Sequence, residues 1–377
     1  MFYRRLLRDT DFTLLVATVL LLVLGVLIQA GATVNMPVGG DPWFYTKRQA
    51  LYAGVGLVAM FGAMFIDYRS FARWAKFIYA GNIGLLALVI VAGSSSMGAQ
   101  RWFYIGSLSI QPSEFAKVAI ILTLAAHLSR RPDRLQRWID LFLPFLHVGV
   151  PALIILAQPD LGTSLVFSGI LLGMLFIAGA AWKHLLTAYG SALAAVVAWV
   201  VLHLRWGVWI PLKEYQLNRL IVFTNANIDP LGAGYHIKQA LVAIGSGGLI
   251  GKGLFSATQG RLKFLPMQHT DFVFAVAGES FGFLGALVLL SLFFIIIWRG
   301  IRIAAEAKDA FGTLVAAGVV SMLAFHVVVN IGMTVGIMPI AGIPLPFISS
   351  GGSALLTNCV AVGLLLGIHF RRRKITF

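Results

Sequence analysis

The stretch from Thr13 to Ala30 reads TLLVATVLLLVLGVLIQA and contains no charged residue. A helix that crosses the hydrocarbon core of a bilayer needs about 20 predominantly apolar residues, so this stretch is long enough to span a membrane. Arg4, Arg5 and Arg8 precede it, and no small-residue cleavage motif follows it. We therefore interpret it as a retained first transmembrane helix and not as a cleaved signal.

The composition of the whole chain agrees with a lipid environment. Of its 377 residues, 59% are hydrophobic and only 11% are charged, whereas a soluble domain carries about 25% charged residues. The net charge of +15 comes from short basic clusters between apolar runs, a pattern typical of membrane topology and not of a nucleic-acid-binding face. The single cysteine, Cys359, excludes a disulfide framework and a cysteine-based zinc site.

Nine further apolar runs follow the first, so the sequence predicts an all-α integral membrane protein with about ten transmembrane helices. We treat residues 1–377 as a single polytopic membrane domain. The predicted spans lie near residues 12–30, 50–67, 75–93, 113–129, 141–158, 163–181, 184–204, 271–297, 311–338 and 352–370.

The distribution of Lys and Arg predicts the orientation. The loops on the same side as the two termini are rich in basic residues, and the short loops on the other side are poor in them. Because basic loops stay in the cytoplasm, we expect both termini there and the segment 205–270 on the outer side. This segment is a large extracytoplasmic loop region between spans seven and eight. Its glycine-rich part, Leu241 to Leu254 (LVAIGSGGLIGKGL), predicts short helices or re-entrant backbone.

Ionisable residues inside or beside the spans are candidates for function. Glu114 and Lys117 lie three residues apart on one face of the fourth span, where they could form an internal salt bridge or bind a polar head group. Asp160 could simply cap the sixth span. Asp271, at the start of the eighth span, could cap that helix or act as a general base. We expect the other histidines to be packed or interfacial, because none has metal-ligand spacing.

The predicted topology brings one set of these polar residues to the outer membrane face. This set mixes cations suited to a phosphate with carboxylates suited to a base or a divalent cation, which favours a lipid with a phosphate head group. The candidate metal ligands, for Mg or Mn, are Asp271, Glu114 and Asp160. The members of the set are Arg101, Gln111, Glu114, Lys117, Asp160, Lys252, His269 and Asp271. The proline- and glycine-rich loop Pro339 to Gly352 faces the same way and predicts a rigid turn.

Several motifs, in order along nearly the whole chain, resemble the SEDS family (shape, elongation, division and sporulation). They are GAQRW (Gly98–Trp102), QPSEFAK (Gln111–Lys117), AQPDLGTS (Ala157–Ser164), FLPMQHTDFVFAVAGE (Phe264–Glu279), NIGM (Asn330–Met333) and GIPLPFISSGGSA (Gly342–Ala354). DPLGAGYHIKQA (Asp229–Ala240) is similar to the elongation branch, the RodA type, more than to the division branch, FtsW.

The resemblance implies a peptidoglycan glycosyltransferase of the bacterial cytoplasmic membrane that polymerises lipid II on the outer side during cell elongation. It implies as partners a class B penicillin-binding protein and other membrane proteins of the elongation complex. It implies neither nucleic acid nor a nucleotide, haem or flavin cofactor. By the resemblance Asp271 is the family's essential aspartate. Arg101, Glu114, Lys117 and Asp160 are similar to its other important polar positions.

Three positions depart from the family pattern. Met267 stands where the family usually has Glu, Ser280 where a second acid often follows Glu279, and Ser350 where Tyr is usual. Two other functions remain open at this point. A lipid II flippase would use the same polar residues to bind a head group without chemistry, and a non-catalytic scaffold would only recruit the crosslinking enzyme.

Overall fold

The computed structural model describes residues 10–96, 99–106, 108–130, 135–210, 214–224, 229, 232–256 and 267–372. Each of the ten predicted spans coincides with one long helix. These helices are α2 (Phe12–Thr33), α3 (Phe44–Phe65), α4 (Tyr68–Ala92), α5 (Pro112–Leu128), α6 (Trp138–Ala157), α7 (Leu161–Ile177), α8 (Trp182–Trp206), α12 (Val273–Ala305), α13 (Ala310–Thr334) and α14 (Gly352–Phe370). Within the described ranges, eight of them are long and apolar enough to cross a membrane, and α5 and α7 have 17 residues each. The fold is therefore that of a helical multi-pass membrane protein.

Aspartates begin several of these helices. Asp11 accepts a hydrogen bond from the backbone N–H of Leu14 at the start of α2, and Asp309 accepts one from Gly312 at the start of α13. A carboxylate at the N-cap satisfies an otherwise unpaired N–H and faces the positive end of the helix dipole. Acidic residues at span ends can thus serve only as helix caps, so an acid needs further contacts before it is assigned a function.

The α12 region differs from the single continuous helix predicted at 271–297. Gly282 has φ 66° and ψ −164°, so its backbone leaves the helical conformation and divides α12 into a short helix before it and a long helix after it. A side chain at this position would collide with the backbone of Gly251. The break could not be read from the apolar run because glycine is common in membrane helices that are unbroken.

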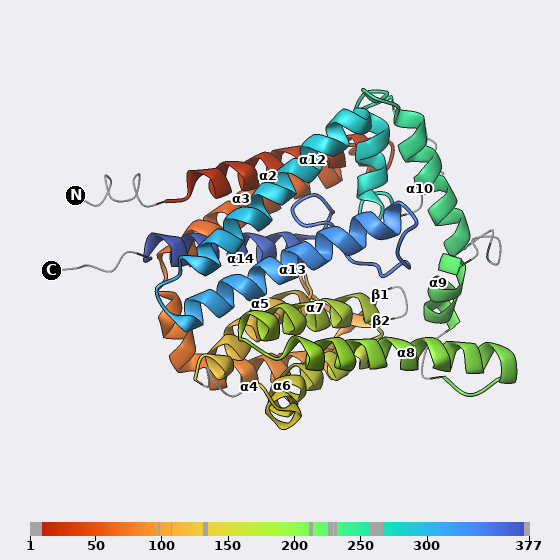
Figure 1. Ribbon diagram of the computed structural model, residues 1–377. Helices are drawn as coiled ribbons and strands as arrows, with labels where there is room; N and C mark the ends of the chain where they lie inside the picture. Colours follow the sequence, from red (N-terminus) through yellow and green to blue (C-terminus); the bar gives the residue numbers. More distant parts are fainter. Residues whose placement is uncertain are drawn as a thin grey trace, which may run out of the picture.

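The predicted 205–270 loop contains two helices, α9 (Glu214–Thr224) and α10 (Ala233–Gly247). The glycine-rich segment after α10 wraps around the break in α12. Lys252 N–H donates to the carbonyl of Glu279, and Phe283 N–H donates to that of Gly248. Non-helical backbone is tolerated beside a bilayer only where such partners satisfy it. Figure 1 shows α9 and α10 at the end of the molecule opposite the two termini.

A small antiparallel sheet was not part of the all-helical prediction. Strands β1 (Ser94–Ser96), β2 (Ala99–Ile105) and β3 (Leu108–Ile110) connect α4 to α5, in the order β1-β2-β3. Its central strand carries Trp102, Phe103 and Tyr104, and aromatic residues favour strands. The turn between β2 and β3 includes Gly106, which has φ 62°. We missed the sheet because the stretch lies between two strong apolar runs.

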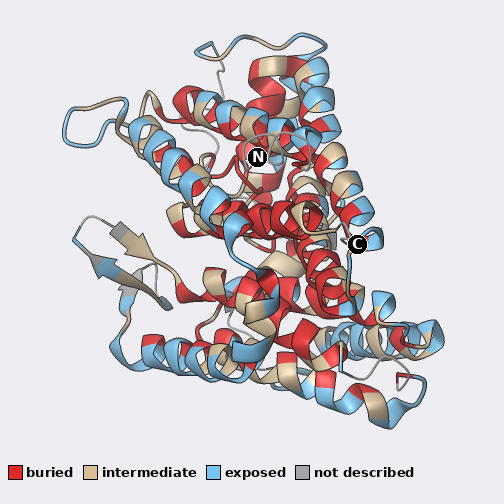
Figure 2. Cartoon of the chain, turned by 90° about the vertical axis from the view of Figure 1, so that its left-hand side faces the viewer, coloured by how far each residue is buried: buried red, intermediate tan, exposed pale blue. Residues whose placement is uncertain are grey.

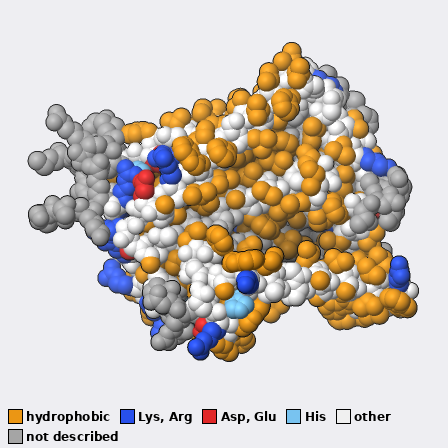
Figure 3. Space-filling view, in the orientation of Figure 1, with side chains coloured by type: hydrophobic (Ala, Val, Ile, Leu, Met, Phe, Trp, Pro, Cys, Tyr) orange, Lys and Arg blue, Asp and Glu red, His pale blue; other side chains and the backbone are white. Residues whose placement is uncertain are grey.

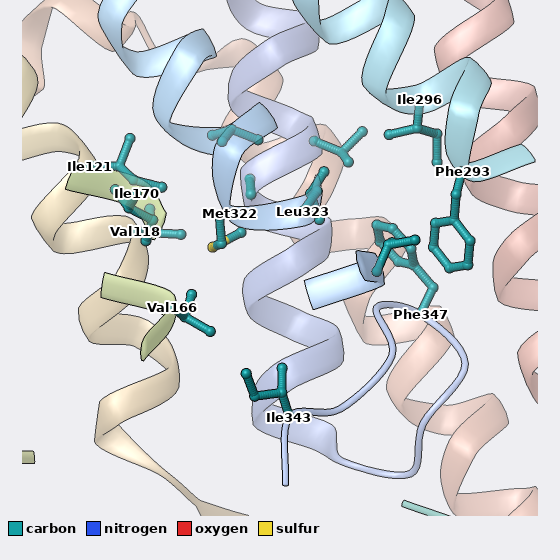
Figure 4. Close-up of a cluster of buried hydrophobic side chains, with 14 of the residues drawn as sticks. Val118, Ile121, Val166, Ile170, Phe293, Ile296, Met322, Leu323, Ile343 and Phe347 are labelled. Atoms are coloured by element: carbon teal, nitrogen blue, oxygen red, sulfur yellow. The ribbon is translucent and has the colours of Figure 1, made fainter. Parts of the chain in front are cut away.

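The core lies around α13 and α14. Figure 2 shows buried residues gathered in the central helices and exposed residues at the periphery. The buried side chains labelled in Figure 4 come from α5, α7, α12, α13 and the loop between α13 and α14: Val118, Ile121, Val166, Ile170, Phe293, Ile296, Met322, Leu323, Ile343 and Phe347. By contrast, Leu185 is the one buried residue of α8 among those described. In Figure 3 hydrophobic side chains cover the middle of the visible face, and charged side chains gather mainly toward its two ends.

Candidate active site

Asp271 lies in the turn that precedes α12, and this turn is held by its own backbone. The carbonyl of Met267 accepts hydrogen bonds from the N–H groups of Thr270, Asp271 and Phe272, at 3.1, 3.2 and 3.4 Å. Met267 has φ 52°, in the left-handed region. The carbonyl at position 267 closes the turn, so the backbone at this departure from the family pattern positions Asp271 without a carboxylate there.

Three neighbouring segments hold the same turn from outside. The carbonyl of Asp271 accepts a hydrogen bond from Asn330 Nδ2 of α13 at 2.9 Å, and that of Thr270 accepts one from Ser349 Oγ at 2.6 Å. The carbonyl of His269 accepts bonds from Gln29 Nε2 of α2 at 2.8 Å and from the N–H of Ser350 at 2.8 Å. All three carbonyls of the His-Thr-Asp sequence are therefore fixed, and none of these bonds uses the Asp271 carboxylate.

The loop between α13 and α14 takes part in this anchoring. Asn330 Nδ2 also donates to the carbonyl of Ile343 at 2.7 Å, and Gln29 Nε2 donates to that of Ile348 at 3.0 Å. The two amides thus tie the loop and the Asp271 turn to α13 and α2. The predicted rigid turn at 339–352 supports the site, and Ser350 does so through its backbone N–H, which any residue supplies.

Two charged groups lie within electrostatic reach of Asp271. They are Arg219 on α9 and Asp160 in the turn before α7. Burial is the largest influence and raises the pKa of Asp271 above its ordinary value. The Arg219 guanidinium and a hydrogen bond with Thr270 lower this pKa, and Asp160 raises it, so that the net shift is upward. Asp271 as a whole residue is half-buried.

Asp160 belongs to a second group of contacts with Gln111 and Arg101. Its Oδ1 accepts the N–H of Thr163 at 3.2 Å, and its Oδ2 accepts Gln111 Nε2 at 3.2 Å. Arg101 donates to the carbonyls of Gln158 and Pro159, and its Nη1 lies 3.8 Å from Asp160 Oδ1. The side chain of Arg101 remains 25% exposed. The structure therefore brings Arg101, Gln111 and Asp160 together, and Asp160 also caps α7 as its simplest interpretation required.

Glu114 and Lys117 form a salt bridge in the interior. Lys117 Nζ lies 2.8 Å from Glu114 Oε2, and the two side chains are only 2% and 6% exposed. Lys117 Nζ also lies 3.0 Å from His326 Nε2, whose other ring nitrogen contacts the carbonyl of Met322 at 2.6 Å. Of the two interpretations of this pair, the internal salt bridge matches the geometry. Sequence inspection missed His326 because nothing in α13 shows that it faces Lys117.

The side chains of Lys252 and His269 contact other residues of the structure. Lys252 Nζ pairs with Glu279 Oε1 at 2.9 Å and with Ser246 Oγ at 2.7 Å, beside the break in α12. The His269 ring packs near Tyr45, with ring centroids 5.4 Å apart.

The sequence analysis did not identify Arg219, although this residue lies in the 205–270 segment that the predicted topology places on the same face as Asp271. Its position in a long ordered segment was the available signal.

The candidate metal ligands do not form a preassembled cage. Among the residues that the structure describes, no group of three or more His, Cys, Asp or Glu side chains could hold a metal ion. Glu114 is paired with Lys117, and Asp160 caps α7. Asp271 alone could contribute a ligand, so the described residues do not fit a metal held by protein groups only.

The fold and the site define a class of protein: a multi-pass helical membrane protein that holds a half-buried carboxylate, Asp271, within electrostatic reach of an arginine, Arg219. Residues 12–374 match the family described as cell cycle protein, FtsW/RodA/SpoVE. The chain belongs to this family.

Relatives and solved structures agree with that assignment. The chain is 39% identical over 363 residues to stage V sporulation protein E of Bacillus subtilis, covering 95% of this chain and 96% of the relative. It is also 39% identical to the peptidoglycan glycosyltransferase MrdB of Escherichia coli, covering 95% and 94%. A chain from a peptidoglycan synthase complex that coordinates polymerization and crosslinking matches with TM-score 0.80 and 33% identity, covering 96% and 98%. The rod shape determining protein RodA of Thermus thermophilus matches with TM-score 0.70 and 30% identity, covering 97% and 98%.

The raised pKa of Asp271 predicts a pH dependence. If the carboxylate acts as a base, only its ionised form is competent, so kcat/KM should rise with pH through this pKa and then level off. We expect the midpoint of the acidic limb above about pH 4, the ordinary value for an aspartate. A rate profile with thermal unfolding measured at each pH tests this. A limb that lies at or below the ordinary value, in folded protein, would contradict it.

Proposed function

We propose that this chain, a peptidoglycan glycosyltransferase by family, polymerises lipid II with Asp271 as the general base. The observation that carries the proposal is the anchoring of the Asp271 turn. Three consecutive carbonyls are bound by groups from α2, α13 and the loop after α13, while the carboxylate faces Arg219. A base must be held in place to act, and here the backbone that carries the carboxylate is anchored through bonds that do not use the carboxylate oxygens.

The reaction joins two lipid-linked sugars. The Asp271 carboxylate takes the proton from the 4-hydroxyl of the acceptor sugar, and that oxygen forms a bond to the anomeric carbon of the donor. The bond from this carbon to the diphosphate oxygen breaks, its electron pair leaves with the lipid diphosphate, and the configuration inverts. No nucleotide is consumed, because the sugar–diphosphate bond supplies the driving force.

The other predicted residues take separate roles in this proposal. Arg101 keeps a partly exposed side chain beside Asp160, and its Nη1 can offset charge on the leaving diphosphate. Gln111 and Asp160 hold Arg101 and the start of α7. Glu114 and Lys117 are too deeply buried to contact a head group directly, and they hold α5 against α13. Lys252 holds the break in α12 through Glu279.

We further propose that the active face is extracytoplasmic, with both termini in the cytoplasm of a bacterium. The asymmetry of Lys and Arg between loops supports this orientation. A class B penicillin-binding protein is the proposed partner, supported by the likeness to a chain of a synthase complex that couples polymerization to crosslinking. The Asp229–Ala240 motif supports a role in elongation, together with the membrane proteins of that complex.

The proposed divalent cation, Mg²⁺ or Mn²⁺, would arrive with the substrate diphosphate. Mg²⁺ sites typically combine one or two carboxylates with substrate phosphates, and the described residues offer no cage of their own. We therefore expect Mn²⁺ to show no saturable binding below about 1 mM without lipid II, as measured by electron paramagnetic resonance, and to bind once lipid II is present. Tight binding to the protein alone would contradict this, and full activity in excess chelator would remove the cation from the proposal.

One experiment separates the enzyme from the two alternatives. Purified wild type is incubated with a class B partner, lipid II and a divalent cation, and glycan polymer is resolved on a gel. In parallel, labelled lipid II is followed across vesicles that contain the protein. Polymer that requires this chain supports the enzyme. Transbilayer movement without polymer would support a flippase, and neither activity, with the partner bound, would support a scaffold.

A further inference from the structure

Arg219 reaches the site from α9, a helix that lies outside the predicted spans. The hydroxyl of Tyr215, on the same helix, donates to the carbonyl of Pro159 at 3.1 Å. The guanidinium of Arg219 lies 5.7 Å from the centroid of the Tyr215 ring. Through the Tyr215 hydrogen bond α9 is docked on the turn that carries Asp160, and the Arg219 guanidinium lies within electrostatic reach of Asp271.

Gly342 lies next to both Arg219 and Asp271. A side-chain carbon at Gly342 would lie 3.1 Å from Arg219 Nη1 and 3.5 Å from Asp271 Oδ2. These two charged atoms therefore lie no more than 6.6 Å apart. Gly342 has φ 68°, which favours glycine. Because it carries no side chain, the space above its Cα between the two charges stays open.

The two groups attract each other without direct contact. Among the described residues, Arg219 and Asp271 form no ion pair within 4.0 Å, although the guanidinium acts on the carboxylate electrostatically. One oxygen atom that makes two hydrogen bonds of about 2.8 Å spans up to about 5.6 Å. The separation of Arg219 Nη1 and Asp271 Oδ2 lies between 4.0 and 6.6 Å, and a single bridging oxygen bonded to both groups covers most of this range.

The chemistry of the two groups selects the kind of oxygen. An ionised carboxylate only accepts hydrogen bonds, and a guanidinium only donates them. A group placed between them must donate to one and accept from the other, which a hydroxyl does. A phosphate would be repelled by Asp271, and an ammonium group by Arg219. The opening therefore fits the hydroxyl of a sugar.

We propose that Arg219 is a substrate-contacting residue that holds the attacking hydroxyl of the acceptor sugar over Gly342, against Asp271. This inference rests on the proposed function. The hydroxyl oxygen accepts a hydrogen bond from Arg219 through one lone pair, while its proton points to Asp271 Oδ2. The other lone pair forms the bond to the anomeric carbon, and the proton moves to Asp271. Arg219 keeps all its protons throughout the step.

The test compares Arg219→Gln, Arg219→Lys and the control Arg205→Gln in complex with a class B partner. Arg205 is an exposed arginine at the end of α8. We expect Arg219→Gln to lower kcat about 100-fold, the size expected for a misplaced reacting group. The KM for lipid II should change by less than about threefold, because the lipid and diphosphate still bind. Arg219→Lys should recover at least about tenfold of the loss, since an ammonium also donates, and Arg205→Gln should match wild type.

Tyr215→Phe distinguishes a direct contact of Arg219 with the substrate from a role of α9 in packing against the Asp160 turn. It removes the hydrogen bond to Pro159 but leaves the guanidinium of Arg219. If Tyr215→Phe loses as much activity as Arg219→Gln, or if Arg219→Gln acts at wild-type rate or mainly through KM, the inference is overturned. Asp271→Asn shows whether the proposed function or only the role of Arg219 has failed. An active Asp271→Asn overturns the proposed base, whereas an inactive Asp271→Asn with a fully active Arg219→Gln overturns the role of Arg219 only.

Discussion

Asp271→Asn is expected to lower lipid II polymerisation by at least about 100-fold while leaving the fold intact. A positioned general base contributes about 10²- to 10⁴-fold to a rate, and an amide of the same shape cannot take the proton. The anchoring contacts of the turn use the backbone carbonyl of Asp271 and not its side chain. The substitution therefore removes the base and preserves its surroundings. The measurement is the rate of glycan formation by the purified variant with its class B partner.

Asp41→Asn provides the matched control for this prediction. Asp41 is an acid in the loop between α2 and α3 whose carboxylate pairs with the exposed Lys47 at 2.9 Å. Its loss should leave the polymerisation rate unchanged. Thermal unfolding of both variants verifies that each is folded. Polymerisation by folded Asp271→Asn at more than about a tenth of the wild-type rate would rule out the proposed base.

Removing one partner of the Glu114–Lys117 pair is expected to cause the largest loss of stability. Taking away a single member of a buried ion pair costs about 3–5 kcal/mol in free energy of unfolding, because the other charge stays buried without compensation. Glu114→Gln should therefore lower the thermal unfolding midpoint strongly. The double variant Glu114→Gln with Lys117→Met should recover most of the loss, because no uncompensated charge remains.

Lys47→Met gives the comparison at an exposed pair. The Lys47 and Asp41 side chains are 70% and 36% exposed, and an exposed ion pair contributes only about 0–1 kcal/mol. Its loss should barely move the unfolding midpoint. If Glu114→Gln unfolded at the wild-type temperature and yet lost activity, the pair would belong to the chemistry of the site and not to its framework.

The helices and the site residues differed in how far they could be predicted. Each predicted span coincides with a long helix because an apolar run is a local property of the sequence, and lipid requires a helix wherever such a run crosses it. The break at Gly282 was not found, because it depends on the approach of Gly251 from another segment. The strands β1 to β3 were not found because they are short and lie between two strong apolar runs.

The candidate site shows the same division. Asp271, Arg101, Glu114, Lys117 and Asp160 were found as charged residues at the ends of apolar runs, where their presence is costly and so informative. The contact of Lys117 with His326 was not found, although the sequence contains both residues. Nothing in the local pattern of α13 distinguishes a histidine packed against lipid-facing neighbours from one that meets a lysine of α5.

The sequence by itself determined which segments lie in lipid and which ionisable residues lie at their ends, because the solvent sets those through local length and polarity. Only the tertiary structure decided which of those residues meet. Asn330 holds the carbonyl of Asp271 from 59 residues away, and Arg219 faces Asp271 across Gly342. Such contacts depend on how helices pack and where loops fold back, and packing couples every segment to the others.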